Sequence, residues 1–591
     1  MSRSAKQDRR QSDEGQSLQL TPAQQAREML ESFAVAFMLM LLMRNCLGEN
    51  YQIPTGSMAP TLQGRHMDVL CAQCGYQYRT GASIENQEHG EARGEVTGTT
   101  CPICRFPMQL DKRANPNERS FSGDRIIVSK LAYWVGEPER WDVIVFKCPA
   151  DAKINYIKRL VGLPGETLEI RHGDIFVVDP ATLQEPAEKR RATIARKPPD
   201  KVLGMLQLVD DSRYIGEALR GVNWPSRWVA VTRDSGAKWR QDESGAEFAV
   251  EAGEQESWLR YRHLIPRPGD WDAILDGAQP NLVQYNGAPY EGMLITDYYA
   301  YNDAAGFANY ATTEATNWVG DLALETQAEV MSEGGELLLD LVEGGAHFTC
   351  RINLASGEAQ LAIGNKDISF RNAAGEVVAT PRCQTPVRGP GTYRLRFANV
   401  DDQLFLWVND EVMAFDGSTM FDSRPDAVPE WSPEDGGDLR PLGIGARQAA
   451  IHFSQLRVLR DVYYLAASVR DPRPEFWHSD YSPDFGREEV YDVLSNPQSW
   501  SSTGLFKSRR SVIYALTPEQ FFPLGDNSPQ SKDARLWSYI DDHGRLVPPA
   551  AVDRSLMIGK AVFVYWPHAW YLPALPLWPL VPNYQRIGMI R

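Results

Sequence analysis

The stretch NYIKRLVGLPGETLEI, residues 155–170, decides how the chain around it folds. Two apolar runs flank a Leu-Pro-Gly sequence, and proline followed by glycine is typical of a tight turn. The segments GDRIIVSKL, residues 123–131, and WDVIVFKCP, residues 141–149, carry similar compact β-branched runs bounded by Gly, Asp or Pro, a pattern that indicates strands. We therefore predict a mainly β fold here, with a strand-turn-strand unit over residues 155–170.

One charged residue lies inside the first strand of that unit. Side chains alternate across a strand, so Lys158 shares a face with Tyr156 and Leu160. Burial disfavours the charged ammonium and lowers the pKa of a lysine from its usual value of about 10.4, which makes the amine a usable base. The alternative is an ordinary strand lysine whose amine reaches solvent. Lys158 is therefore a candidate base if the chain also supplies a nucleophile.

A candidate nucleophile lies in YQIPTGSMAPTLQG, residues 51–64. Prolines restrict the backbone on both sides of Ser57, and Gly56 lets the chain bend tightly. A serine in such a stretch is either a turn residue or a nucleophile, and a nucleophilic hydroxyl needs a base within hydrogen-bond reach. The nine histidines occur in no G-x-S-x-G or H-E-x-x-H context, so neither an α/β-hydrolase elbow nor a zincin helix is evident. Lys158 is the alternative base.

The size and charge of the chain exclude some classes of protein. A chain of 591 residues is long enough for roughly three to five domains. Its formal net charge of −16 argues against a nucleic-acid-binding protein, because the phosphate backbone favours clustered Lys and Arg.

The stretch MLESFAVAFMLMLLMRNCL, residues 29–47, predicts a membrane anchor. A helix of that length spans about 28 Å, close to the thickness of the hydrocarbon core. A buried core helix is the alternative, because the uninterrupted apolar part, residues 33–43, is short. Several Lys and Arg residues precede the stretch, so the positive-inside rule places residues 1–28 in the cytoplasm and the rest outside. No small-residue cleavage pattern follows, which favours a retained anchor over a removed signal peptide.

Two C-x-x-C pairs follow the candidate nucleophile. Cys71 and Cys74 form the first pair, and Cys101 and Cys104 form the second. This spacing is typical of a zinc ribbon, in which four thiolates bind a tetrahedral Zn²⁺. Two disulfides are the alternative, because the predicted topology places the pairs in an oxidising compartment.

Residues 285–465 have the pattern of an all-β sandwich. Short runs alternate apolar and polar residues with period two, and Gly, Asn and Asp occupy the turns. This pattern of strands and turns resembles that of concanavalin-like and laminin-G-like jelly rolls, which often bind carbohydrate. As an insert, such a module either binds a carbohydrate or protein ligand or acts as a scaffold. We expect it to be separable from the rest of the chain, with its own core and a Pro-rich charged linker before it.

Three segments together resemble one family. IPTGSMAPTL resembles the serine box of the type I signal peptidases, NYIKRLVGLPGE their lysine box, and GDNSPQSKDAR their C-terminal box. The other strand-like runs resemble further family segments, and all of them follow the family's order behind an N-terminal anchor. The resemblance implies a mainly β peptidase domain with a transmembrane helix. It also implies removal of signal peptides from exported preproteins after Ala-x-Ala-like sites, with no cofactor for catalysis.

The resemblance also implies roles for individual residues. Ser57 corresponds to the nucleophile and Lys158 to the general base, while the Thr55 hydroxyl joins the Ser57 N–H in the oxyanion hole, where developing negative charge needs aimed donors. The C-terminal box supplies three supporting residues, namely Ser531, which orients the lysine, and the charged pair Asp533 and Arg535. Six apolar residues are implied for the substrate pockets, with ordinary core packing as the alternative: Ile53, Pro54, Met58, Leu62, Tyr156 and Ile157.

These assignments give an expected organisation. The expected segments are a cytoplasmic tail (1–28), an anchor (29–47), a peptidase domain (48–68, 112–180 and 506–591), a zinc-ribbon-like insert (69–111), a linker with a β-rich start (181–284), the sandwich (285–465) and a return linker (466–505). The expected location is the cytoplasmic (inner) membrane, with a single pass and the catalytic domain on the extracytoplasmic side. The expected partners are signal peptides, the lipid bilayer and a carbohydrate or protein ligand of the sandwich, without nucleic acid.

Two other hypotheses remain open at this point. One is a different Ser/Lys maturation peptidase, and the other is a catalytically inactive, membrane-anchored protein that binds glycans or proteins. The anchor and the residue sequence of the lysine box disfavour a different Ser/Lys maturation peptidase. The presence of Ser57, Lys158 and Ser531 together disfavours the second.

Overall fold

The structure is a computed structural model. It describes residues 21–46, 48–86, 94–115, 118–149, 151–186, 189–231, 238–267, 269–279, 282–283, 289–303, 316–364, 367–424, 427–469, 479–540, 546–547, 551–572 and 575–591. Most of the expected cytoplasmic tail, residues 1–20, lies outside the described residues.

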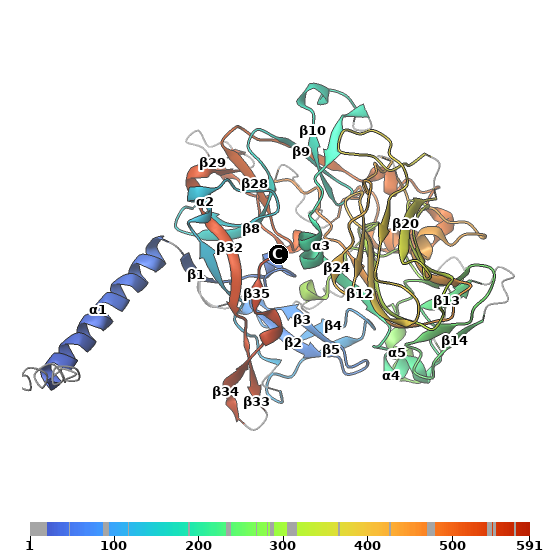
Figure 1. Ribbon diagram of the computed structural model, residues 1–591, viewed down its shortest axis with the longest axis horizontal. Helices are drawn as coiled ribbons and strands as arrows, with labels where there is room; N and C mark the ends of the chain where they lie inside the picture. The colour runs from blue at the N-terminus through green and yellow to red at the C-terminus, as the bar shows by residue number, and fades with distance from the viewer. Residues whose placement is uncertain are drawn as a thin grey trace, which may run out of the picture.

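The helix α1 (Pro22–Cys46) projects away from the β-rich body (Figure 1). It covers all but the last residue of the stretch 29–47. Its described large apolar side chains are more than half exposed: Met29, Leu30, Phe33, Val35, Phe37 and Met38. Among the described residues, no helix combines the length and the apolar character needed to cross a membrane.

The first large sheet contains the strands predicted around Lys158. Its order is β1 (Gly48–Gln52), β6 (Arg125–Ser129), β32 (Met557–Trp566), β7 (Val143–Lys147), β8 (Asn155–Gly162), β28 (Gln520–Leu524) and β31 (Val552–Asp553), and β35 (Gly588–Met589) pairs with β32. The strands β6, β7 and β8 coincide with the predicted runs, and Gly165 adopts a φ of 78° in the predicted turn. The mainly β prediction is confirmed for this region.

A second sheet continues from the first through the turn at Gly165. Its order is β11 (Ala192–Ile194), β10 (Asp174–Val178), β9 (Thr167–Arg171) and β27 (Ser511–Ala515). β9 is the second strand of the predicted unit, and its neighbour β27 comes from the far end of the sequence. The two sheets therefore join segments from both sides of the sandwich.

Several two-stranded hairpins accompany these sheets. The pairs are β2 (His66–Leu70) with β3 (Gln77–Gly81), β4 (Gly98–Thr100) with β5 (Pro107–Gln109), β29 (Tyr539–Ile540) with β30 (Leu546–Val547), and β33 (Ala569–Leu572) with β34 (Leu575–Pro582). The first two hairpins each carry one C-x-x-C pair in the connecting turn. The two C-x-x-C pairs therefore lie in turns of the same kind.

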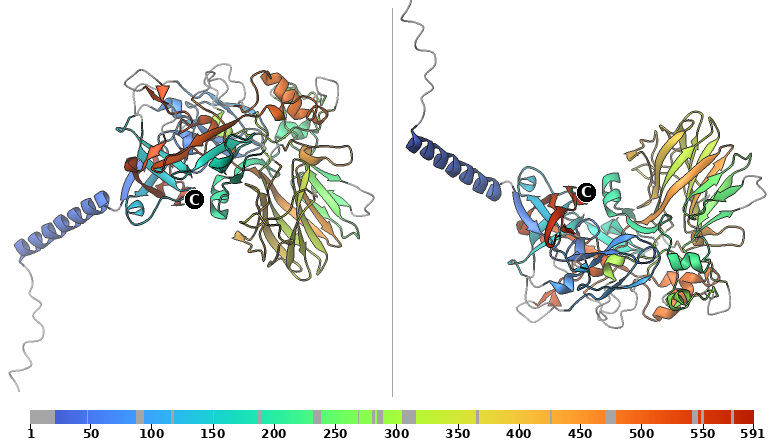
Figure 2. Two further views of the ribbon diagram at one scale, coloured as in Figure 1. Left: turned by 90° about the horizontal axis from the view of Figure 1, so that it is seen from above. Right: turned by 90° about the horizontal axis from the view of Figure 1, so that it is seen from below.

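A β-sandwich lies at the opposite end of the body from α1 (Figures 1 and 2). One sheet has the order β14 (Trp239–Gln241), β15 (Phe248–Val250), β26 (Ile451–Arg460), β17 (Leu322–Val330), β22 (Gly391–Asn399), β23 (Leu404–Val408) and β24 (Glu411–Val412), with β12 (Gln207–Asp211) also paired to β26. The other has the order β13 (Trp228–Val231), β16 (Ser257–Tyr261), β25 (Leu442–Arg447), β18 (Glu336–Glu343), β19 (Ala346–Asn353), β20 (Glu358–Ile363) and β21 (Arg382–Gln384). Both sheets contribute to one apolar core, so the two sheets form a sandwich.

The sandwich begins earlier than the sequence indicates. Strands β12 to β16 precede residue 285, yet they belong to the two sandwich sheets. These strands are only three to five residues long, so each contains too few alternations to be distinguished from loop. The expected linker is not free either, because the buried Lys197 pairs with Asp401 at 2.6 Å and with Asp461 at 2.7 Å.

Short helices connect the strands. They are α2 (Ala132–Val135), α3 (Pro199–Met205), α4 (Glu217–Gly221), α5 (Asp270–Leu275) and α6 (Arg487–Ser495). α6 lies in the expected return linker, where Val490, Val493 and Leu494 are buried against Leu264 and Trp318 of the preceding segments. The return segment is therefore packed against its surroundings.

Candidate active site

The serine loop, residues 53–64, connects β1 to β2. A single 3₁₀ turn, η1 (Gly56–Met58), places the Ser57 side chain in a site that leaves 8% of the residue exposed. Thr55 precedes this turn with extended backbone and is exposed. The loop closes tightly at Gly64, where a Cβ atom would lie 2.1 Å from the Thr55 carbonyl carbon. Only glycine fits there, so the return of the loop fixes the Thr55–Gly56 peptide.

Lys158 lies on β8 with its amine at the serine hydroxyl. The distance from Lys158 Nζ to Ser57 Oγ is 2.6 Å, and Nζ also donates to the carbonyl oxygen of Ile157 at 3.0 Å. Lys158 is 2% exposed. Burial lowers the pKa of Lys158 to about 8, against the attraction of Asp533 and Asp526, which acts to raise it. The candidate nucleophile and the candidate base are therefore in contact although 101 positions separate them.

The C-terminal box reaches the same point because β28 pairs with β8. Phe522 is opposite Gly162 and Leu524 is opposite Arg159, so the loop that follows β28 passes beside Lys158. A Cβ atom on Gly525 would lie 2.2 Å from Ser531 Oγ and 2.4 Å from the Ser57 carbonyl oxygen. The structure therefore packs Ser531 and Ser57 against the same glycine.

Asp533 and Arg535 stabilise the loop after β28 through hydrogen bonds. Arg535 Nε and Nη2 donate to the two carboxylate oxygens of Asp533 at 2.8 and 2.7 Å. Asp533 also accepts from the Gly525 N–H at 3.0 Å. Arg535 Nη1 donates to the Leu465 carbonyl oxygen at 3.0 Å and to the Ser528 hydroxyl at 2.7 Å. The pair thus connects the loop after β28 to the end of the sandwich segment.

Sequence reasoning missed a second buried ion pair beside the lysine. Arg159 Nε and Nη2 donate to the two oxygens of Asp526, each at 2.7 Å, and both side chains have no exposed area. Thr61 Oγ1 donates to the same carboxylate at 2.5 Å. The signal was present, because Arg159 and Asp526 are opposite charges within the quoted lysine and C-terminal boxes. A buried charge of either sign requires such a partner.

Asn527 was also missed, and it contacts the serine loop directly. Its N–H donates to the Ser57 carbonyl oxygen at 3.1 Å, and its Nδ2 donates to the Gly56 carbonyl oxygen at 3.0 Å. An asparagine between an aspartate and a serine reads locally as a turn residue. The sequence alone therefore did not identify it.

Three of the six expected pocket residues lie in the core instead. Met58 and Leu62 are 0% exposed and Ile53 is 2% exposed, and all three pack in the cluster that contains Ile126 and Val128 of β6. They cover the face of the first large sheet beneath the serine loop, so they cannot line an open groove. The other three, Pro54, Tyr156 and Ile157, are half-buried.

The four cysteines of the C-x-x-C pairs converge. Cys71 Sγ lies 3.5 Å from Cys104 Sγ, and Cys74 Sγ lies 3.6 Å from Cys101 Sγ. All four are free thiols whose sulfur atoms lie within 4.8 Å of one another. Tetrahedral Zn²⁺ with Zn–S bonds of about 2.3 Å requires sulfur atoms roughly 3.8 Å apart. The arrangement therefore fits one zinc ion, and the sulfur separations are too long for disulfide bonds.

A second group of possible ligands, His66, Asp68 and His568, is a hydrogen-bonded chain. His66 Nδ1 donates to the Gly64 carbonyl oxygen at 2.6 Å, and His66 Nε2 lies 3.1 Å from His568 Nδ1. The other nitrogen of His568 pairs with Asp68. Burial lowers the pKa of His66 to about 3, so this imidazole is neutral. His568 therefore joins His66 to Asp68 through its two ring nitrogens.

A third group contains Asp174, Asp321 and Asp401 between the second sheet and the sandwich. The Lys197 amine pairs with Asp401. Burial raises the pKa of Asp174, Asp321 and Asp401. Lys197 therefore supplies a positive charge beside these buried carboxyl groups.

Comparison with known proteins places a similar segment around Lys158. Residues 106–217 match the profile of the family described as "Signal peptidase, peptidase S26". This range includes Lys158 and excludes Ser57 and Ser531. Among solved structures, the chain is similar to the carbohydrate-binding module CBM66 from Bacillus subtilis at 11% identity and a TM-score of 0.19, covering 39% of this chain and 94% of that one. Sheep galectin-11 matches at 12% identity and a TM-score of 0.16, covering 24% and 90%. These scores are too low to assign a fold.

Curated relatives carry the same family name. The chain is 30% identical over 138 residues to signal peptidase I of Pseudomonas aeruginosa, covering 23% of this chain and 32% of the relative. It is 27% identical over 154 residues to signal peptidase I of Rickettsia felis, covering 26% and 44%. It is 42% identical over 65 residues to signal peptidase I of Bacillus caldolyticus, covering 11% and 34%. The chain spans less than half the length of each of these relatives. The comparisons and the mainly β fold thus agree on a segment similar to the S26 signal peptidases.

Proposed function

We propose that this protein is a membrane-anchored serine endopeptidase of the type I signal peptidase kind. It removes signal peptides from exported preproteins after Ala-x-Ala-like sites. The observation that carries the proposal is the 2.6 Å contact between the buried Lys158 amine and the Ser57 hydroxyl. A lysine with a pKa of about 8 is a neutral amine at moderately alkaline pH. A serine nucleophile requires such a neutral base to accept its proton.

In the first half of the reaction, Ser57 Oγ attacks the scissile carbonyl carbon while its proton passes to Lys158 Nζ. The carbonyl oxygen becomes an oxyanion between the Ser57 N–H and the Thr55 hydroxyl. The intermediate then collapses, the C–N bond breaks, and the Lys158 ammonium returns the proton to the leaving amine. The products are the free mature chain and an ester on Ser57.

In the second half, the neutral Lys158 amine takes a proton from water. The oxygen of that water attacks the ester carbon as its proton leaves, and a second oxyanion forms at the same donors. Collapse breaks the bond to Ser57 Oγ, which recovers its proton from Lys158. Ser531 packs against Gly525 beside this pair.

The test is cleavage of a preprotein by the detergent-solubilised full chain. Ser57→Ala removes the nucleophile and Lys158→Met removes the base at similar volume, so each should reduce turnover to the uncatalysed level. Thr55→Val should lower kcat by about 10²- to 10³-fold, which is typical of losing one oxyanion donor. Cleavage by Ser57→Ala at the wild-type rate contradicts the dyad. A mature product that does not begin directly after a small-x-small sequence contradicts the proposed specificity.

We also propose that α1 anchors the protein in a membrane. Six large apolar side chains on α1 are more than half exposed, and such a surface requires a lipid or protein cover. The basic residues before it favour a cytoplasmic N-terminus. The full chain should sediment with membranes through alkaline carbonate and dissolve only in detergent, whereas recovery in the carbonate supernatant contradicts anchoring.

Finally, we propose a structural Zn²⁺ bound by Cys71, Cys74, Cys101 and Cys104. The support is the convergence of four free thiols from two hairpins. The ion joins the two hairpins and takes no part in the cleavage chemistry.

A further inference from the structure

Residues 297–303, here called the bridging segment, run from the sandwich to the serine loop. Arg460 of β26 donates to the carbonyl oxygens of Asp297 at 2.8 Å and Tyr298 at 3.1 Å. Thr80 of β3 donates to the carbonyl oxygens of Ala300 at 3.3 Å and Asp303 at 3.2 Å. The bridging segment is therefore fixed both to the sandwich and to the first cysteine hairpin.

The tip of the bridging segment is the 3₁₀ turn η6 (Ala300–Asn302), and it contacts the catalytic loops. Asn302 Nδ2 donates to Asn527 Oδ1 at 2.8 Å, and Asn527 Nδ2 donates to Asn302 Oδ1 at 2.7 Å. The two amides thus form a reciprocal pair across 225 positions of sequence. Asn302 lies within the insert, outside all segments that resemble a signal peptidase.

Tyr301 packs on the same loop. Its side chain is buried, and its ring lies so close to Gly56 that a Cβ atom there would be 2.3 Å from Tyr301 Cε1. The ring therefore covers Gly56 on one side while Asn527 binds its carbonyl oxygen at 3.0 Å. The Gly56–Ser57 peptide is restrained by residues from two distant parts of the chain.

The orientation of this peptide determines the direction of the Ser57 N–H. A trans peptide is planar, so its carbonyl and its N–H point in opposite directions. Fixing the Gly56 carbonyl toward Asn527 Nδ2 therefore directs the Ser57 N–H away from Asn527. In the proposed mechanism this N–H is an oxyanion donor, and such donors act best when they are already aimed.

Asn527 can fix the peptide only in one amide orientation. Its Nδ2 supplies two hydrogens, one for the Gly56 oxygen and one for Asn302 Oδ1, while its Oδ1 accepts from Asn302. A rotated amide would turn its oxygen toward the Gly56 oxygen, where no hydrogen is available. The pairing with Asn302 holds the amide plane in place, so all donors and acceptors of this group are satisfied.

We propose that Asn302 and Tyr301 of the inserted segment are positioning residues for the oxyanion hole, so that the peptidase depends on its insert for catalysis. This inference rests on the proposed function. Asn302 acts through Asn527 and the Gly56–Ser57 peptide, and it makes no contact with the substrate. Its effect belongs to transition-state stabilisation, so it should change kcat and leave KM nearly unaltered.

The experiment compares Asn302→Ala and Asn302→Asp with the wild-type full chain in detergent. Rates are expressed per active serine, counted by stoichiometric labelling with a fluorophosphonate, so that loss of folded protein does not alter them. Asn302→Ala should lower kcat by about 10-fold, less than the 10²- to 10³-fold cost of deleting a donor outright, with KM within about twofold. The matched control is Asn353→Ala, at an exposed asparagine that ends β19 of the sandwich, which should leave kcat unchanged.

Asn302→Asp tests the pH dependence of kcat, which a merely structural role of Asn302 would not change. A protonated aspartic acid can still donate to Asn527 Oδ1, whereas the carboxylate cannot. The ratio of variant to wild-type kcat should therefore fall as the pH rises. This variant is isosteric, so it remains informative if Asn302→Ala does not accumulate.

The outcomes separate this inference from the proposed function. If wild type cleaves signal peptides and the Asn302 variants match its kcat at every pH, the positioning role is wrong and the peptidase assignment stands. If wild type cleaves none, the peptidase assignment is wrong. The labelling rate of Ser57 by the fluorophosphonate then decides the inference alone, because an unchanged rate in Asn302→Ala overturns it and a rate lowered about 10-fold supports it.

Discussion

The Lys158 amine is subject to opposing influences of unequal size. Burial favours the neutral amine, while Asp533 and Asp526 favour the ammonium. Each carboxylate is already paired, Asp533 with Arg535 and Asp526 with Arg159, so each exerts a reduced attraction on the lysine. Burial therefore dominates and lowers the pKa of Lys158 to about 8.

This pKa predicts the pH dependence of cleavage. Below pH 8 the ammonium predominates and cannot accept the Ser57 proton, so kcat/KM should rise about tenfold per pH unit and level off above the pKa. The measurement is initial cleavage rate of a signal-peptide substrate between pH 5.5 and pH 9.5, with unfolding monitored in parallel. An optimum in acid or a rate independent of pH would contradict Lys158 as the base.

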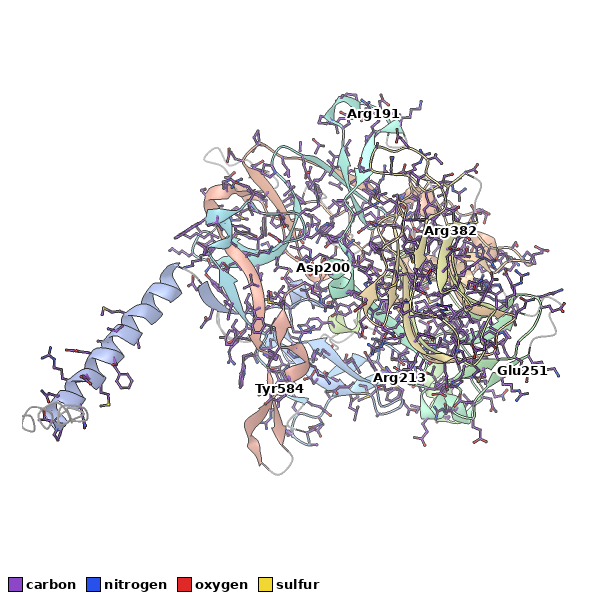
Figure 3. All side chains as sticks on the ribbon, viewed as in Figure 1. Arg191, Asp200, Arg213, Glu251, Arg382 and Tyr584 are labelled. Atoms are coloured by element: carbon purple, nitrogen blue, oxygen red, sulfur yellow. The ribbon has the colours of Figure 1, made fainter. Side chains whose placement is uncertain are left out.

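The buried pair Arg159–Asp526 predicts a large loss of stability on neutralisation. Asp526→Asn leaves the fully buried Arg159 without a counter-charge, which typically costs about 3–5 kcal/mol. The matched control is Glu251→Gln, because Glu251 pairs with Arg240 at the periphery of the molecule (Figure 3), where such pairs contribute about 1 kcal/mol or less.

Urea unfolding followed by tryptophan fluorescence measures both variants. The transition of the peptidase sheets should shift to lower urea in Asp526→Asn and stay in place in Glu251→Gln. Equal shifts in the two variants would mean that the buried pair contributes no more than an exposed one.

At the scale of elements, the hairpins β2–β3 and β4–β5 predict one zinc ion per chain. Each hairpin is too short to bury much apolar surface alone, so the metal should supply part of their folding free energy. Metal analysis should find one zinc in wild type and none in Cys101→Ser, with lower thermal stability in the variant. Cys148→Ser, at another buried free thiol, is the control and should retain zinc.

Two disulfides are the outcome that would contradict this prediction. Alkylation of the denatured protein without a reductant distinguishes the cases, because thiols of a zinc site react once the protein unfolds. Protection of all four cysteines under those conditions, with no zinc present, would establish the disulfide alternative.

The longer elements could be predicted from the sequence, and the reasons are local. β6 to β9 were predicted because their alternating apolar residues and the Pro-Gly turn are contained within each segment. The strands β13 to β15 were not, since three or four residues carry too little periodicity. In the site, Lys158 on a strand face and Ser57 between prolines were candidates only, and the resemblance of the three boxes to one family singled them out. Asn302 carried none, because its role depends on a partner 225 positions away.

At the scale of the whole molecule, the insert and the peptidase are interlocked. The sandwich has its own core, as expected for a separable insert. However, Asn302 binds Asn527, Lys197 binds Asp401, and the Leu465 carbonyl binds Arg535. The expectation of a freely separable sandwich over residues 285–465 therefore conflicts with these contacts.

Replacing residues 285–465 with a short Gly/Ser linker should consequently fail to give active enzyme. The deletion removes β17, β18, β25 and β26, so β12 and β15 lose their partner β26, β16 loses its partner β25, and unpaired edges are exposed. We expect aggregation, rapid proteolysis and no cleavage of a small peptide substrate. A monomeric deletion variant with wild-type peptide cleavage would show that the sandwich is dispensable.

The pairing of Asn527 with Gly56, across 471 positions, has a consequence for the order of events during synthesis. Ser57 and Lys158 leave the ribosome long before the C-terminal box that packs beside them. Closing so long a loop carries an entropic cost that grows with its length, but β12 pairs with β26, so a folded sandwich already brings the two flanks of the loop together. If the proposed function is right, the nascent chain therefore stays inactive until its insert has folded, and truncated translation products should cleave no substrate.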